Sequence, residues 1–320
     1  MRNMLPNDLF VEQPFQTTVC GNVFLEGIGL HSGRFVRMVI RPAPANNGIK
    51  FRRMDISGQL STVIAHASFA ERARLCTRIV NSEGITLETI EHLMATFAGI
   101  GLDNAVIETD SSEAPILDGS SQPILDAITN AGLEALPAKR KCMVVTKPVE
   151  VELEPGAWAR LAPSDHLQID VKIEFDDRAI GKQAYCYKHK DGSFAAELAN
   201  ARTFCQLRDV ESMQNAGLAL GGSLNNAIVV DNGKILNEGG LRVEREFVRH
   251  KVLDCLGDLF LIGMPMKGKM TVERPGHALS TKLVQALLSD PTNYEVVEAG
   301  KEYDGSGSFA MPELAAAAMA

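Results

Sequence analysis

The sequence has few aromatic residues and no long apolar run. Phe, Trp and Tyr together make up 6% of its 320 residues, and Trp occurs once. No stretch approaches the roughly 20 consecutive apolar residues that a membrane-spanning helix needs. The N-terminal residues 1–8 also lack the apolar segment of a secretory signal. We therefore predict a cytoplasmic protein without stable insertion into a membrane.

The sequence also lacks an excess of basic residues. Its 32 Lys and Arg are outnumbered by 40 Asp and Glu, which gives a formal net charge of -8. Binding to a nucleic-acid backbone needs a basic surface, so we do not expect nucleic acid as a partner. Hydrophobic residues make up 45% of the chain, which is enough for a substantial core, and the length allows two domains of ordinary size.

Cysteine pairs with the spacing of a metal site are absent too. None of the six cysteines stands in a Cys-x-x-Cys pair, so we predict reduced, partly buried thiols that act as small apolar residues. Cys255 follows a candidate metal ligand, but successive residues of a helix point about 100° apart, so we do not count it as a ligand. The six positions are Cys20, Cys76, Cys142, Cys186, Cys205 and Cys255.

Two polar segments of the chain contain the residues of a catalytic metal site. His250 and Asp254 are four apart, and on a helix such residues lie on one face, where both can bind one ion. His92 would be the third ligand, which leaves a fourth tetrahedral position for water, as in catalytic zinc. Glu91, adjacent to this ligand, would act as the general base for that water. These four residues predict a hydrolytic Zn2+ centre.

The spacing of His250 and Asp254 is weak by itself, because it occurs by chance in many helices. In this segment, however, Asp258 continues the polar line by one more turn, while the apolar residues follow a separate helical stripe. A solvated helix face would also give a polar line, but such faces favour Lys and Glu. A further carboxylate suits a metal site, where outer carboxylates orient the imidazole ligands.

A third polar segment contains His277, which follows a Pro-Gly pair. This histidine could be an isolated surface residue on a loop. Its functional interpretation is a general acid that protonates a leaving amine, because imidazole titrates near neutral pH. We expect Ser280 to cap the N-terminus of a helix over residues 281–289.

Several other functions are disfavoured by missing patterns. Residues 27–33 are rich in glycine, but they lack both the phosphate-loop ending and the spacing of a dinucleotide-binding motif. A tight turn between two strands explains these glycines. A zinc peptidase remains a rival, although the usual His-Glu-x-x-His is missing. A carrier of lipids or nucleotide sugars is a second rival, which would have no need of Glu91 and His277.

The chain divides into two halves near residues 136–141, where a proline and a charge run interrupt the apolar pattern. Strand-like segments precede helix-like ones in each half, which indicates α+β layering rather than alternating β-α-β units. The predicted strands are residues 17–26, 35–41, 105–109, 143–153, 158–163 and 167–175, and the predicted helices are residues 88–98, 122–131, 241–262 and 281–289.

The sequence resembles the zinc-dependent UDP-3-O-acyl-N-acetylglucosamine deacetylases, which catalyse the committed step of lipid A synthesis in Gram-negative bacteria. Five motifs carry the resemblance, and they occur in the family's order between about residues 15 and 300. Each motif is weak alone, but five in order make a chance match improbable. The motifs are residues 27–33, 89–95, 201–204, 250–259 and 276–280.

The resemblance implies roles for individual residues. It places the zinc ligands at His92, His250 and Asp254, the base at Glu91 and the catalytic histidine at His277. It further implies an oxyanion-assisting hydroxyl and a carboxylate that pairs with the catalytic histidine, as well as three residues that contact an acylated UDP-sugar substrate. These are Thr203 for the oxyanion, Asp258 for the histidine, and Lys251, Phe204 and His31 for the substrate.

The resemblance also implies an architecture. We expect two α+β domains of similar sheet-on-helix layering, each with an inserted unit and with the active site at their interface. The expected ranges are 1–138 and 139–303, followed by a disordered tail at 304–320 that is rich in Gly, Ser and Ala. Residues 207–226 read either as an ordinary core helix or, in the family, as part of a passage for the acyl chain. A monomer is favoured.

Overall fold

The computed structural model describes residues 14–57 and 61–298, in which helices and several β-sheets are mixed. The expected α+β class is confirmed. The predicted tail at 304–320 lies outside the described residues. Within those residues, no helix combines the length and the apolar character that crossing a membrane requires.

The first half of the chain is built around a five-stranded sheet. Alternate residues of its strands are buried, such as Val36, Met38 and Ile40, because successive side chains of a strand point to opposite faces. Neighbouring strands are antiparallel except for one parallel pair, between the third and fourth positions. In order across the sheet, the strands are β2 (Val23–Ile28), β3 (Phe35–Pro42), β9 (Ala105–Thr109), β4 (Ile49–Arg53) and β5 (Thr62–Ile64).

The second half is built around a seven-stranded sheet. Its long central strand, β19 (Met266–Glu273), pairs with three other strands and alternates between buried and half-buried residues. The other strands are β11 (Lys141–Val145), β12 (Val149–Glu154), β13 (Ala157–Ala162), β14 (Leu167–Glu174), β15 (Lys182–Lys188) and β20 (Tyr294–Glu298).

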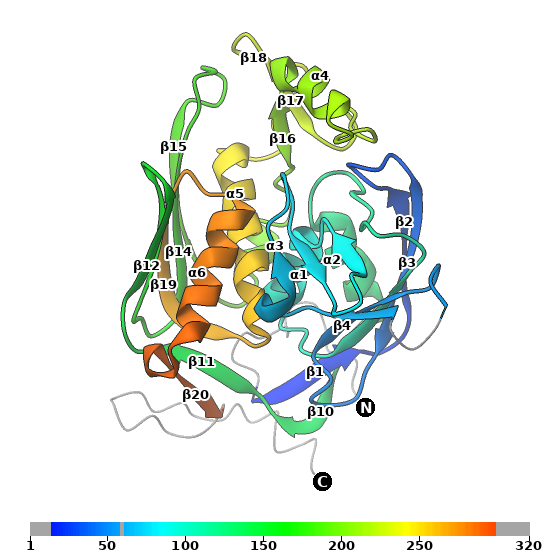
Figure 1. The fold of residues 1–320 in the computed structure, drawn as a ribbon, viewed down its shortest axis with the longest axis vertical. Coiled ribbons are helices and arrows are strands. Elements are labelled where there is room, and N and C mark those ends of the chain that lie inside the picture. Colours follow the sequence, from blue (N-terminus) through cyan, green and yellow to red (C-terminus); the bar gives the residue numbers. More distant parts are fainter. Residues whose placement is uncertain (1–13, 58–60, 299–320) are drawn as a thin grey trace.

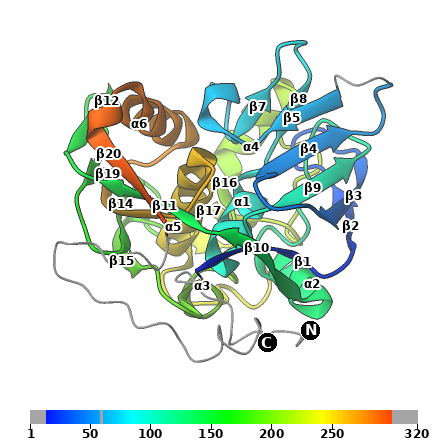
Figure 2. The same ribbon diagram turned by 90° about the horizontal axis from the view of Figure 1, so that it is seen from below.

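Helices fill the space between the two large sheets (Figures 1 and 2). The first half contributes α1 (Glu91–Ile100), which packs against α5 (Glu246–Leu259) of the second half. A third helix, α6 (His277–Ser289), packs on β12 and β13 and on α5. The remaining α-helices of the described residues are α2 (Gln122–Ala131), α3 (Ser193–Glu197) and α4 (Leu207–Asn215).

The close packing of α1 on α5 depends on Gly257. A Cβ atom at this position would lie 2.1 Å from the backbone oxygen of Glu91, so any side chain would force the two helices apart. Glycine inside a helix costs roughly 0.5–1 kcal/mol relative to alanine. The close approach places the first turn of α1 beside the middle of α5.

Each half also carries a small three-stranded sheet, in agreement with the expected inserted units. A separate two-stranded sheet, β1 (Phe15–Val19) with β10 (Leu133–Lys139), leads from the first half to β11 across the expected junction at residues 136–141. The domain boundary at 138 stays a prediction. The small sheets consist of β6 (Ala70–Glu71), β7 (Arg78–Val80) and β8 (Thr86–Glu88), and of β16 (Phe204–Gln206), β17 (Ile228–Asp231) and β18 (Lys234–Ile235).

Several predicted segments are confirmed. The strand at 105–109 and the helix at 122–131 have the expected bounds, and the glycine-rich segment 27–33 ends β2 and turns toward β3. Other segments were predicted too long. The strand expected at 143–153 is divided into β11 and β12 around Pro148, which cannot donate a hydrogen bond to a neighbouring strand. The strand expected at 17–26 is likewise divided, and α5 begins five residues later than residue 241.

One prediction about a helix was wrong, and one of two open interpretations is excluded. Ser280 does not cap α6, because this helix already begins at His277 with Gly276 as its N-cap, and Ser280 is buried inside it. For residues 207–226, the interpretation as an ordinary core helix is excluded. None of the nine residues of α4, all of them described, is buried, and its mean hydropathy is low because polar residues outnumber apolar ones.

The prediction about the cysteines was partly wrong. All six lie in the described part of the chain and are free. Cys76 and Cys255 are buried and behave as expected, whereas Cys20 and Cys186 are exposed.

Candidate active site

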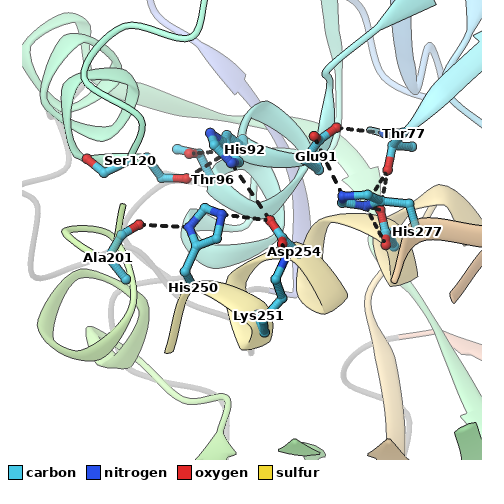
Figure 3. A network of polar contacts seen from close by, with 12 residues as sticks. Thr77, Glu91, His92, Thr96, Ser120, Ala201, His250, Lys251, Asp254 and His277 are labelled. Atoms are coloured by element: carbon cyan, nitrogen blue, oxygen red, sulfur yellow. Dashed lines mark hydrogen bonds and ion pairs between the residues drawn. The ribbon is translucent and has the colours of Figure 1, made fainter. Parts of the chain in front are cut away.

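Three helix segments bring the predicted site residues together (Figure 3). Glu91 and His92 occupy the first turn of α1, and His277 is the first residue of α6. His250 and Asp254 lie one turn apart on α5, and Asp258 follows one turn later. The site is therefore assembled from both halves of the chain, as expected.

The three predicted metal ligands form one compact group. One ligand atom from each of His92, His250 and Asp254 can be chosen so that all three lie within 4.8 Å of one another. The Asp254 Oδ1 atom is 3.3 Å from His250 Nε2 and 3.7 Å from His92 Nε2. This oxygen is buried and has no hydrogen-bond donor among the described residues. An uncompensated buried oxygen facing two imidazole nitrogens fits a site that holds a cation.

Neighbouring groups fix the direction of these ligands. His250 Nδ1 donates a hydrogen bond to the backbone oxygen of Ala201 at 3.0 Å, which leaves the lone pair on Nε2, facing Asp254. Lys251 Nζ donates to Asp254 Oδ2 at 2.8 Å, so the other carboxylate oxygen remains available. Both contacts orient a ligand atom toward the centre of the group.

The protonation states also suit metal binding, which needs neutral imidazoles and an ionised carboxylate. Burial lowers the pKa of His250 to about 3, against the attraction of Asp254. Burial likewise lowers the pKa of His92. For Asp254, burial acts to raise the pKa, but His250 and Lys251 outweigh it and hold the pKa well below its usual range.

A second polar group, formed by Glu91, Asp258 and His277, lies beside the ligands. His277 Nδ1 is 3.1 Å from Asp258 Oδ2, and His277 Nε2 is 3.8 Å from Glu91 Oε1. Burial raises the pKa of Glu91 to about 7, against the charge of His277. Burial acts to lower the pKa of His277, but the carboxylates of Asp258 and Glu91 outweigh it and raise the pKa to about 10. This group therefore pairs a potential base with a protonated imidazole.

The residues predicted to contact substrate lie around this centre. Lys251 Nζ is 5.4 Å from the centroid of the Phe204 ring, and that ring contacts His250 edge-on. Thr203 is held by its backbone, which donates to the Gly119 oxygen at 2.8 Å. The role predicted for its hydroxyl stays a prediction.

His31 lies in the turn between β2 and β3 and is buried. Its Nδ1 accepts a hydrogen bond from the backbone N–H of Ala219 at 3.3 Å, which joins the turn to residues 207–226. Its Nε2 has no hydrogen-bond partner in the described part of the chain. The turn is held in addition by Glu113, which accepts hydrogen bonds from the backbone N–H groups of His31 and Ser32.

Two residues of the site were not found from the sequence. Thr77 contacts Glu91, Asp258 and His277, but nothing in its local sequence marks it. Gly257 did leave a signal, because a glycine that interrupts an apolar helical pattern often marks close packing.

The sequence is similar to proteins of one named family. Residues 16–289 match the family described as UDP-3-O-acyl N-acetylglycosamine deacetylase. Proteins named UDP-3-O-acyl-N-acetylglucosamine deacetylase from Shewanella frigidimarina and Shewanella oneidensis are each 42% identical over 300 residues, covering 93% of this chain and 97% of theirs. A protein of the same name from Shewanella piezotolerans is 40% identical over the same coverage. With the match spanning most of its length and both polar groups in place, the chain belongs to the UDP-3-O-acyl N-acetylglycosamine deacetylase family.

Proposed function

We propose that this protein removes the N-acetyl group of UDP-3-O-(3-hydroxyacyl)-N-acetylglucosamine, releasing acetate and the free amine, as the committed step of lipid A biosynthesis. The observation that carries the proposal is the convergence of a three-ligand metal group and a base–acid pair in a chain of this family. We further propose that the enzyme acts in the cytoplasm as a monomer. The free cysteines agree with a reducing compartment.

The ligand group supports Zn2+ as the cofactor. Zinc bonds of about 2.0–2.2 Å place tetrahedral ligand atoms roughly 3.3–3.6 Å apart. The distances from Asp254 Oδ1 to His250 Nε2 and His92 Nε2, 3.3 and 3.7 Å, are close to that range. Two imidazoles and one carboxylate form a donor set used by catalytic zinc, with a position open for water. When bound, zinc would lower the pKa of that water to about 7 and polarise the acetamide carbonyl.

The protein's own groups would then move the protons. Glu91 Oε1 accepts the proton of the attacking water, because its partner oxygen is already engaged by the Thr77 N–H. The Thr203 hydroxyl donates to the oxyanion that develops on the acetamide, a contribution of about 3 kcal/mol in comparable sites. The departing amine takes a proton from His277 Nε2 or, alternatively, back from Glu91. Asp258 holds His277 from its Nδ1 side.

The substrate contacts complete the proposal. Lys251 and Phe204 would lie against the sugar nucleotide or its acyl chain, and His31 has a buried Nε2 available for a polar contact. We place the acyl chain along residues 207–226. This unit is on the surface and exposes Leu207, Leu220 and Leu224, apolar side chains that a bound acyl chain would cover.

Metal analysis combined with an acetate-release assay tests the function. Purified protein should contain about one equivalent of zinc and release acetate from the acylated UDP-sugar, and a chelator should abolish the release. Cleavage of peptides in place of the sugar would favour a zinc peptidase. Tight substrate binding without acetate release would favour a carrier.

A further inference from the structure

Thr77 connects the small sheet of the first half to the active site. It immediately precedes β7 and is 2% exposed, and the chain turns inward just before it, where Leu75 adopts a φ of 67°. Few residues other than glycine tolerate this left-handed conformation. Through its hydroxyl and its backbone N–H, Thr77 reaches all three members of the group formed by Glu91, Asp258 and His277 (Figure 3).

The hydroxyl of Thr77 has only one proton to donate. Its Oγ1 lies 2.5 Å from Asp258 Oδ1 and 3.0 Å from His277 Nδ1. An ionised carboxylate can only accept, so the hydroxyl proton goes to Asp258. Thr77 Oγ1 is then an acceptor for His277, so Nδ1 carries a proton. That Nδ1–H is shared between Thr77 Oγ1 and Asp258 Oδ2, which lies 3.1 Å away. This arrangement keeps His277 Nε2 as the nitrogen that exchanges a proton with substrate.

The backbone of Thr77 orients the other partner. Its N–H donates to Glu91 Oε2 at 2.9 Å, while Glu91 Oε1 faces His277 Nε2 at 3.8 Å. That separation is too long for a direct hydrogen bond. Both working atoms therefore point into one space, where each can contact a reacting group.

We propose that Thr77 is a positioning residue of the reaction, whose hydroxyl acts together with Asp258 to hold His277 with Nδ1 protonated and with Nε2 directed at the leaving amine. The inference rests on the proposed deacetylase function. The proposed role of Thr77 differs from a merely structural one, in which its hydroxyl would only form hydrogen bonds that stabilise the core. A structural role would affect stability but would not depend on His277.

Three single variants of the zinc-loaded full chain separate these roles. Thr77→Val keeps the shape and the backbone N–H but removes the hydroxyl, so kcat should fall about 10–100-fold, as for other orienting partners, with KM and zinc content unchanged. Thr77→Ser keeps the hydroxyl and should stay close to wild type. Thr18→Val removes another buried hydroxyl, bonded to the Asn104 oxygen at 2.8 Å, and should lower Tm without lowering kcat.

A double-mutant cycle gives the decisive comparison. If Thr77 acts through His277, Thr77→Val should cause no further loss of kcat in a His277→Ala background. An equal fold-loss in both backgrounds would overturn the proposal, as would a Thr77→Val enzyme with wild-type kcat.

One measurement is independent of the substrate. The His277 Nδ1–H proton resonance in the NMR spectrum should shift in Thr77→Val and stay in place in Thr77→Ser. An unchanged resonance in Thr77→Val would overturn the proposal even if the deacetylase function were wrong. If the wild type released no acetate but the resonance still shifted in Thr77→Val, only the proposed deacetylase function would be rejected.

Discussion

The two residue groups of the active site contain the same side-chain types, histidine and carboxylate, but their histidines differ in charge. In the ligand group, His92 and His250 have lowered pKa values, and one oxygen of Asp254 is left without a hydrogen-bond donor among the described residues. In the neighbouring group, His277 has a raised pKa and contacts the carboxylates of Asp258 and Glu91.

The difference follows from how many carboxylates each imidazole faces. His92 and His250 share the single carboxylate of Asp254, which Lys251 also engages, so burial dominates and both imidazoles stay neutral. His277 lies between two carboxylates, whose combined attraction exceeds the effect of burial. The same residue type thus suits a proposed metal ligand in one place and a proposed acid in the other.

The largest effect should come from removing a ligand. Asp254→Ala deletes a predicted zinc ligand and also leaves Lys251 without its 2.8 Å partner, so metal and activity should disappear together. The loss should exceed the roughly 10–100-fold cost of losing an outer partner. Zinc analysis and acetate release measure it, and His92→Ala should behave alike.

Asp170→Ala is the matched control for this variant, because Asp170 also pairs with a lysine at 2.8 Å but lies on β14. It should keep full zinc and full activity. Full zinc occupancy in both Asp254→Ala and His92→Ala would refute the ligand assignment.

A smaller effect is expected when the base is removed and the ligands are kept. Glu91→Gln preserves shape but cannot accept a proton, so turnover should fall about 10²–10⁴-fold while zinc content and substrate affinity are retained. Glu108→Gln, which changes a carboxylate paired with Arg41 on the five-stranded sheet, serves as the control. Near-normal turnover of Glu91→Gln would assign the base role to another group.

Changing the carboxylate behind His277 should move a pKa rather than abolish the reaction. A histidine that must be protonated loses activity as pH rises through its pKa, which the structure places at about 10. Asp258→Asn removes one of the two attracting charges, so the pKa should fall and the alkaline limb of the kcat profile should move to lower pH. His277→Ala should lower the plateau and remove this limb. If the alkaline limb of the kcat profile kept its position in both Asp258→Asn and His277→Ala, the acid role of His277 would be rejected.

The smallest effect concerns the proposed acyl passage. Leu220→Gln should reduce kcat/KM several-fold for the acylated UDP-sugar and leave an unacylated one unaffected, because binding energy from the remote chain helps to position the acetamide. Val296→Gln is a control at a comparably exposed apolar residue, since the two are 53% and 46% exposed. Equal losses for both substrates would indicate misfolding and contradict the passage.

The ligand group could be predicted because its residues carry their own signal. His250, Asp254 and Asp258 repeat at helical spacing, and the two aspartates are the only charged residues between Val252 and Leu259. The start of α6 could not be predicted so well. Gly276 resembles a turn residue after Pro275, whereas Ser280 resembles a cap by composition, and only the fold shows that Ser280 is buried.

Thr77 could not be predicted because its contacts are distant in sequence. Its partners Asp258 and His277 are 181 and 200 positions away, and an isolated threonine before a short strand has many possible roles. The surface position of α4 was left open for another reason. Its flanking small and apolar residues allowed a core helix as one interpretation, but the helix itself is polar, so burial would have been unfavourable.

The position of the predicted ligands on two different helices has a thermodynamic consequence. His92 comes from α1, and His250 and Asp254 come from α5, so an unfolded chain rarely brings the three together. An ion held between them therefore binds the assembled protein in preference to the unfolded chain, and its binding free energy adds to the stability of the α1–α5 contact. Above the dissociation constant, each tenfold rise in free metal should add about 1.4 kcal/mol to that stability. In this protein, the ion that supports the chemistry would also act as a crosslink between the two halves.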